Sequence, residues 1–181
     1  MISAFLCWAF AVCAAAAPEP EPARTGPTAA QVMDVAVPLV ARWEGLSLTA
    51  YLDRIASPPV WTICYGETEG VRQGEVRTRA QCEQGLRQGL VRYRAGWYRS
   101  LLPETPVRHL TPERDAAFTS LCWNIGIAGC GGSTATRRLN AGDVRGACEA
   151  LTWWNRAGGR VVRGLQNRRA DEHRLCVAGL R

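Results

Sequence analysis

Three residues near the start of the chain have the types and order that cleavage of a sugar bond requires. Glu44 is followed by Asp53 after eight intervening residues and by Thr62 after eight more. A carboxylic acid can protonate the leaving oxygen, while a carboxylate assists water or stabilises positive charge at the sugar carbon. A hydroxyl can orient that water because it both donates and accepts hydrogen bonds. The spacing alone decides little, since chains of this size carry many solvated carboxylates.

The elements around Glu44 favour a role as the acid. Thr28 and Gln31 have the spacing of a helix capping box, and an apolar pattern follows through Trp43. Pro38 is expected to kink or restart this helix, and Gly45 is placed to end it. Glu44 would therefore stand at a helix end beside Trp43, where partial desolvation favours its protonated form.

The rest of the pattern predicts an α+β, mostly helical fold with two lobes. Residues 46–74 have the short apolar runs and turn residues of a small β-hairpin lobe. Helical signals then return and predict a larger helical lobe, interrupted at Gly126–Gly132. Its helix starts are expected at Thr78, Thr111, Ser133 or Thr134, Asp143 and near Gly164, the last helix running through Cys176. A cleft between two lobes is a common place for an active site.

The N-terminal part divides into two segments before the main domain. Residues 1–17 contain an uncharged apolar run of 16 residues (2–17), shorter than the roughly 20 that span a bilayer. This run predicts a signal peptide or a signal-anchor, although no basic residue precedes it and Pro18 would follow cleavage after Ala17. Residues 18–30 are expected to form a Pro-rich linker, and residues 31–181 the main domain. We expect export to the periplasm or to the medium.

Cysteine usage fits an oxidising compartment. Of eight Cys, Cys7 and Cys13 lie in the apolar run and six lie in the main domain. No Cys-x-x-Cys pair occurs and there are only two His, so we expect no metal and no other cofactor. We expect at least one disulfide, while six cysteines allow about 15 pairings that sequence does not distinguish.

The charge suits an anionic polymer. The formal net charge is +6, and all 22 basic residues are Arg. Such a protein is attracted to nucleic acid, anionic lipid or bacterial cell wall. A nucleic-acid binder is one alternative, but the relevant arginines are more simply explained as a solvated helix face or a wall-facing surface: Arg87, Arg92, Arg94 and Arg99. We expect no nucleic-acid partner and a monomer.

Several segments together resemble the bacteriophage T4-type lysozymes, glycoside hydrolase family 24, which include many phage endolysins. The first three are Trp43-Glu44-Gly45, Ala50-Tyr51-Leu52-Asp53 and Thr62-Ile63-Cys64-Tyr65-Gly66-Glu67-Thr68. Matching segments follow in order at Phe118–Gly126, Ser133-Thr134, Arg138-Leu139-Asn140, Trp154-Asn155, Gly158-Gly159, Gly164-Leu165, Arg168-Arg169 and Glu172. The resemblance therefore runs from about residue 35 to residue 176.

The resemblance implies a role for each matched residue. Glu44 corresponds to the general acid, Asp53 to the second carboxylate and Thr62 to the hydroxyl that holds water. Arg168 corresponds to an Arg that contacts the catalytic Glu. The implied reaction is hydrolysis of the β-1,4 bond between N-acetylmuramic acid and N-acetylglucosamine in peptidoglycan. Two features depart from the family pattern: a longer gap between Asp53 and Thr62, and Cys64 where many members have Gly.

Two readings of the same resemblance stay open. A lytic transglycosylase would act on the same substrate with Glu44 alone, and a non-catalytic wall-binding module would use Glu44 only structurally. The N-terminal layout also resembles phage endolysins whose apolar segment holds the enzyme at the membrane and then releases it. A transient membrane association through residues 1–17 is therefore expected, and Cys7 and Cys13 would allow disulfide exchange.

Overall fold

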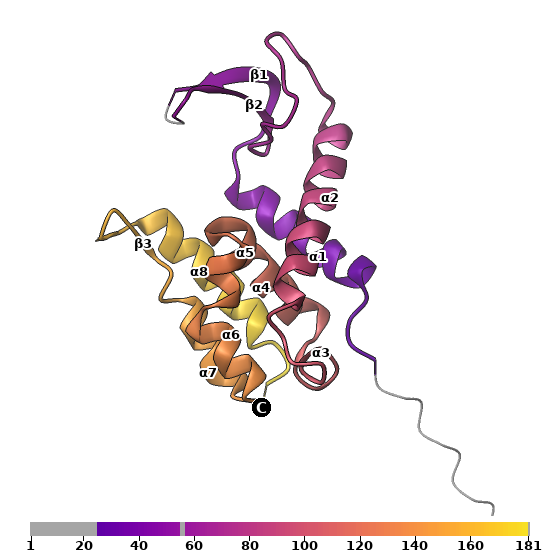
Figure 1. Cartoon of the computed structure of the whole chain (residues 1–181), viewed down its shortest axis with the longest axis vertical. Coiled ribbons are helices and arrows are strands. Elements are labelled where there is room, and N and C mark those ends of the chain that lie inside the picture. The colour runs from indigo at the N-terminus through magenta and orange to yellow at the C-terminus, as the bar shows by residue number, and fades with distance from the viewer. Residues whose placement is uncertain (1–24, 55–56, 181) are drawn as a thin grey trace, which may run out of the picture.

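The computed structural model describes residues 25–54 and 57–180. Helix α1 (Ala29–Trp43) leads into an antiparallel hairpin of β1 (Ser47–Asp53) and β2 (Val60–Cys64), and the long helix α2 (Arg79–Tyr98) connects the hairpin to the remaining helices. Figure 1 shows the hairpin at one end of the molecule and the helices α3 to α8 gathered at the other. The predicted mostly helical, two-lobed fold with a small β lobe is confirmed.

The helical lobe follows α2 in chain order. Its helices and short strands are α3 (Thr105–His109), α4 (Pro112–Ile125), α5 (Ile127–Gly131), α6 (Thr134–Asn140), α7 (Val144–Leu151), β3 (Arg156–Ala157), β4 (Arg160–Val161) and α8 (Arg163–Cys176). Both α1 and α8 pack against α4, so the first and last helices share one partner. This arrangement brings the end of α1 close to the middle of α8.

The predicted helix starts are confirmed by side-chain caps. Thr28 and Thr78 each form a capping box with the Gln three residues later. Thr111, Ser133 and Asp143 each accept a hydrogen bond from the backbone N–H three residues further on. These caps satisfy orphan N–H groups locally, which is why sequence predicts them well.

Three local features go beyond what the sequence predicted. Of the kink or restart predicted at Pro38, the restart is wrong: α1 continues through Pro38, because packing against α2 and α4 outweighs the backbone bond that Pro38 lacks. The predicted break at Gly126, with φ +82°, is confirmed as the end of α4, and the short helix α5 that follows it was not predicted. The hairpin of β3 and β4 was not predicted; Gly158 and Gly159 both have positive φ, as a tight two-residue turn requires.

Two apolar clusters hold the lobes together. One joins α1, β2 and α2 through buried side chains that include Val32, Met33, Ile63 and Leu86. The other lies in the helical lobe around Trp97, which stacks on Phe118 at 5.0 Å between ring centroids. Both clusters contain residues of α2 and α4, so these helices connect the lobes.

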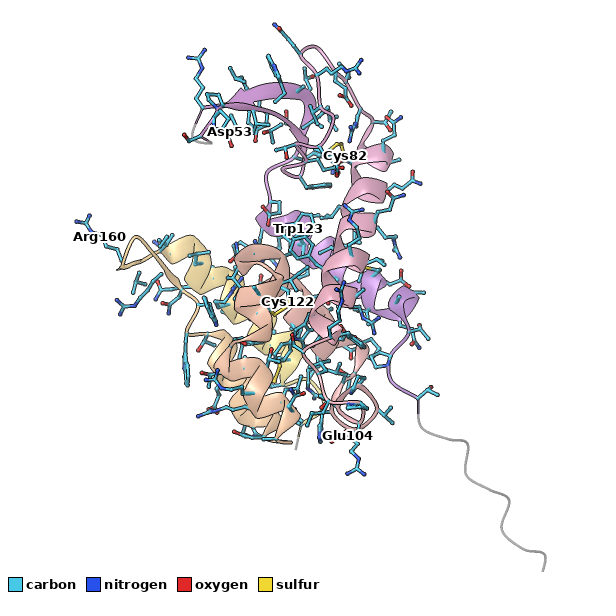
Figure 2. All side chains as sticks on the ribbon, viewed as in Figure 1. Asp53, Cys82, Glu104, Cys122, Trp123 and Arg160 are labelled. Carbon is cyan, nitrogen blue, oxygen red and sulfur yellow. A yellow bond between two sulfur atoms is a disulfide. The ribbon has the colours of Figure 1, made fainter. Side chains whose placement is uncertain are left out.

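Six cysteines form three disulfides, which confirms the prediction of at least one. Cys64–Cys82 joins the end of β2 to the first turn of α2, where Figure 2 labels Cys82. Cys122–Cys130 joins α4 to α5, and Cys148–Cys176 joins α7 to α8. Cys64 is thus paired, so its side chain stabilises the loop after Thr62.

The N-terminal predictions concern residues that the structure mostly does not describe. The apolar segment 1–17, Cys7 and Cys13 lie outside the described residues, as does most of the predicted linker 18–30. Helix α1 begins at Ala29, two residues before the predicted start of the main domain. None of the described helices combines the length and the apolar character that crossing a bilayer demands.

Candidate active site

Glu44 terminates α1 and stands next to the β lobe. It is the C-cap of the helix, and its N–H donates to the carbonyl of Val40 at 3.0 Å. Its φ of −97° and ψ of 139° turn the chain from helix to extended structure, so only Gly45 and Leu46 separate it from β1. The Glu44 side chain is 26% exposed. A carboxyl group is thus presented at the junction of the two lobes, partly shielded from water.

Arg168 of α8 meets this carboxyl group. Its Nη1 lies 2.8 Å from Glu44 Oε1, although 124 residues separate the two in sequence. The Arg168 side chain is only 4% exposed. A charge-assisted bond to a buried guanidinium fixes the orientation of the Glu44 carboxyl group.

The hairpin register brings Asp53 and Thr62 to the same face. Asp53 pairs with Val60 and Tyr51 pairs with Thr62, which makes Asp53 and Thr62 diagonal neighbours. Diagonal residues of an antiparallel pair lie about 7–8 Å apart and can interact through their side chains. Figure 2 shows Asp53 on the hairpin, across from the helical lobe that carries Trp123. The longer gap between Asp53 and Thr62 lies at the turn of this hairpin.

Thr62 is nearly buried, with 3% of its surface exposed. Its hydroxyl group donates to the Val60 carbonyl at 3.3 Å. The lone pairs of the hydroxyl oxygen could then accept a hydrogen bond from a water. The structure therefore brings Glu44 and Arg168 into direct contact, and Asp53 and Thr62 together on the hairpin.

A hollow of about 360 Å³ lies between the β lobe and the helices. It is lined by the loop Gly66–Glu69, by α2 and by Trp123 of α4: Gly66, Glu67, Thr68, Glu69, Gly85, Gln88, Gly89, Arg92, Tyr93 and Trp123. The ring centroids of Trp123 and Tyr93 lie 5.0 Å apart. An aromatic ring beside polar groups is well suited to a sugar, whose faces are apolar and whose edges carry hydroxyl groups.

The hollow shares two elements with the Glu44 site. Trp123 lies one helical turn after Ser120, whose carbonyl and hydroxyl both contact Arg168. Gly66 follows Thr62 after three residues, across the turn that ends β2.

Sequence reasoning missed the partners behind Arg168. Glu172 is fully buried on α8 and contacts both Arg168 and the Ser120 hydroxyl. The spacing of Arg168 and Glu172, four residues apart on a predicted helix, is a signal that could have indicated the pair. Ser120 gives no such signal, because its 52-residue separation from Glu172 is bridged only by the packing of α4 on α8.

Comparison with known proteins adds independent findings. A family model described as phage lysozyme matches residues 41–172. A SAR-endolysin of Enterobacteria phage P21 is 35% identical over 75% of this chain and 78% of its own length. A SAR-endolysin of Escherichia phage N15 is 39% identical over 76% of this chain and 74% of its own.

Solved structures agree with these matches. The endolysin of Escherichia coli O157:H7 phage FAHEc1 is 31% identical, with a TM-score of 0.65 over 83% of this chain and 92% of its own. The P22 lysozyme mutant L86M is 28% identical, with a TM-score of 0.67 over 79% of this chain and 95% of its own. The two-lobed arrangement is therefore shared along nearly the whole length of these proteins.

Proposed function

The chain belongs to the phage lysozyme family, and on that premise we propose that it hydrolyses peptidoglycan with Glu44 as its general acid. The bond cut is the β-1,4 bond between N-acetylmuramic acid and N-acetylglucosamine. The observation that carries the assignment is the position of Glu44, which ends α1 at the lobe junction in contact with a buried Arg168.

The proposed reaction balances with the groups present. Glu44 gives its proton to the bridging oxygen, and the bond between that oxygen and the sugar carbon breaks. A water supplies the hydroxyl group to the carbon, and its remaining proton returns to the Glu44 carboxylate, directly or through Asp53, which regenerates the acid. Asp53 and Thr62 assist this water: the carboxylate draws its proton or stabilises the positive carbon, and the Thr62 lone pairs hold it.

The hollow beside Trp123 would bind the glycan strand on one side of the cut bond. Its polar groups include Glu67, Gln88 and Arg92 around the aromatic ring. Peptidoglycan strands are the partner, and the net charge of +6 favours association with an anionic wall. The site is built from α1, α4 and α8 of one chain, which supports action as a monomer.

We further propose export with residues 1–17 retained as a releasable anchor. Relatives named SAR-endolysins support export of this chain. The three disulfides support an oxidising destination. The apolar run of 16 residues, short for a stable span, supports transient association with the membrane.

The decisive test compares wild type with Glu44→Gln on purified peptidoglycan. The Gln side chain keeps the size of Glu44 but cannot donate the acid proton, so clearing should fall by about 10³-fold or more. Glu149→Gln, an exposed substitution on α7, is the matched control and should clear at the wild-type rate.

Retained clearing by Glu44→Gln would leave only a binding role for the site. Product mass separates the two enzymatic readings, because hydrolysis adds one water to each cut and a lytic transglycosylase leaves an anhydro sugar without it. Products lacking the added water would replace the hydrolase with the transglycosylase.

A further inference from the structure

A fully buried carboxylate, Glu172, has no part in the reaction described above. It lies on α8 one turn after Arg168, and its side chain is 0% exposed. Its Oε1 accepts from the Ser120 hydroxyl at 2.6 Å, from Arg169 Nη2 at 2.9 Å and from Arg168 Nε at 3.3 Å. Three donors on one oxygen are an expensive arrangement to bury for stability alone, since an apolar substitute of similar volume would often serve as well.

Arg168 connects this carboxylate to Glu44. Nη1 of Arg168 donates to Glu44, Nε donates to Glu172, and Nη2 donates to the carbonyl and hydroxyl oxygens of Ser120 at 3.3 and 3.4 Å. Because the guanidinium is planar, contacts from all three nitrogens fix the direction in which Nη1 points. Glu172 and Ser120 thereby determine how Arg168 meets Glu44.

The same contacts place two guanidinium groups next to the Glu172 carboxylate. Arg168 and Arg169 are both buried, at 4% and 1% side-chain exposure. Arg169 Nε lies 2.8 Å from Glu172 Oε2 as an ion pair, without the angle of a hydrogen bond. Arg168 thus contacts both carboxylates, whereas Arg169 contacts Glu172. The negative charge of Glu172 offsets part of the positive field that Arg168 exerts on Glu44.

The other charged groups near Glu172 form ion pairs with other residues. Asp171 of α8 pairs with Arg42 of α1 and with Arg174. Helix α4 faces Glu172 with the Ser120 hydroxyl, and α7 meets α8 at the Cys148–Cys176 disulfide. Among the described contacts, Arg168 and Arg169 are therefore the cations that face Glu172.

We propose that Glu172, held by Ser120, is a positioning residue for the general acid, an inference that rests on the proposed function of Glu44. It holds the Arg168 plane so that Nη1 orients the Glu44 carboxyl group, and it partly neutralises Arg168. A general acid must carry a proton at the moment of reaction, and an uncompensated guanidinium at 2.8 Å would oppose that.

The test uses Glu172→Gln, Glu172→Asp and Ser120→Ala in the full chain, with Glu149→Gln as the exposed control of equal charge change. For each variant, kcat, KM and the pH dependence of kcat are measured on purified peptidoglycan, at a temperature well below its own Tm. Loss of clearing in Glu44→Gln is established first, so that failure of the function and failure of this network are told apart.

Glu172→Gln should lower kcat about tenfold with little change in KM, because the substrate does not touch Glu172. It also leaves the Arg168 charge beside Glu44 less neutralised, so the alkaline limb of the kcat profile should move to lower pH. Glu172→Asp keeps the negative charge at this position, so the alkaline limb of its kcat profile should stay at the wild-type pH. Ser120→Ala keeps the two carboxylates and the two guanidinium groups of the network. It should lower kcat severalfold and shift the alkaline limb less than Glu172→Gln does.

A purely structural Glu172 predicts a different pattern. Tm would fall in Glu172→Gln while kcat and the alkaline limb stayed at their wild-type values, and that result overturns the proposal. Should Glu172→Gln fail to fold, Ser120→Ala decides: a wild-type kcat and a wild-type alkaline limb in that variant overturn the proposal equally.

Discussion

At the scale of single residues, two glycines on α2 set the shape of the hollow. A Cβ added at Gly89 would lie 2.7 Å from Cζ3 of Trp123, and one at Gly85 would lie 2.3 Å from Oε1 of Glu67. Glycine inside a helix costs about 1 kcal/mol relative to alanine. The absence of a side chain at these positions lets Trp123 and Glu67 lie directly against the helix.

Gly89→Ala should therefore raise KM for peptidoglycan severalfold by displacing the Trp123 ring. Overpacking costs about 1–3 kcal/mol, offset in part by roughly 1 kcal/mol of helix propensity, so the free energy of unfolding should fall slightly. Steady-state kinetics and thermal unfolding measure the two effects. Gly164→Ala on α8, where an added Cβ meets nothing within 4 Å, is the control and should leave KM unchanged.

Equal KM values for wild type and Gly89→Ala would mean that Trp123 does not contact the glycan. The hollow would then be a consequence of lobe packing, and the binding surface would have to be sought elsewhere along the hairpin.

At the scale of elements, the disulfides divide into one that holds the β lobe and two that hold the helical lobe. Cys64–Cys82 closes 18 residues and lies two positions after Thr62, whereas Cys148–Cys176 closes 28 residues far from the hairpin. The chain-entropy relation gives stabilisation of about 3 and about 3.5 kcal/mol for the two loops. Their thermodynamic effects are therefore similar, while their positions differ.

Replacing both Cys64 and Cys82 by Ser should lower Tm and also lower kcat, because the end of β2 is no longer tied to α2. Replacing both Cys148 and Cys176 by Ser should lower Tm by a similar amount but leave kcat near wild type at low temperature. Paired measurements of Tm and kcat on the two double variants test this. A loss of kcat that follows Tm equally in both would show that the Cys64–Cys82 link does not act on the site.

Sequence predicted the elements whose signals are local. The caps at Thr28, Thr78 and Asp143 follow from side chains that bond to backbone within three residues. The short elements α3, α5 and β3–β4 were missed because segments of two to five residues gain their stability from packing, which no local pattern records.

The candidate site was predictable only in part, for the same reason. Glu44 at a helix end could be placed from spacing, and Arg168 was implied only by the family resemblance. The contacts of Glu172 and Ser120 depend on α4 packing against α8 across 52 residues, so they required the structure. Local sequence patterns therefore predict the helix caps and the candidate carboxylates. The contacts that position Glu44 depend on tertiary packing and could not be predicted in this way.

At the scale of the whole molecule, the chain joins an apolar N-terminal run to a basic, disulfide-bonded domain with a net charge of +6 for the whole sequence. If the run is retained as a releasable anchor, soluble active protein should still contain residues 2–17. Intact mass spectrometry of released protein from cells that produce the full sequence measures this directly. A mass lacking Met1–Ala17 would instead identify a cleaved signal peptide.

The contact between Glu44 and Arg168 also bears on how the protein is made. The two residues are 124 positions apart, so the ribosome adds the partner of Glu44 long after Glu44 itself has been synthesised. Until α8 has been translated and has docked on α4, a growing or truncated polypeptide carries Glu44 without the guanidinium that it contacts in the folded protein. The contact that orients the Glu44 carboxyl group therefore forms only after α8 has been added to the growing chain.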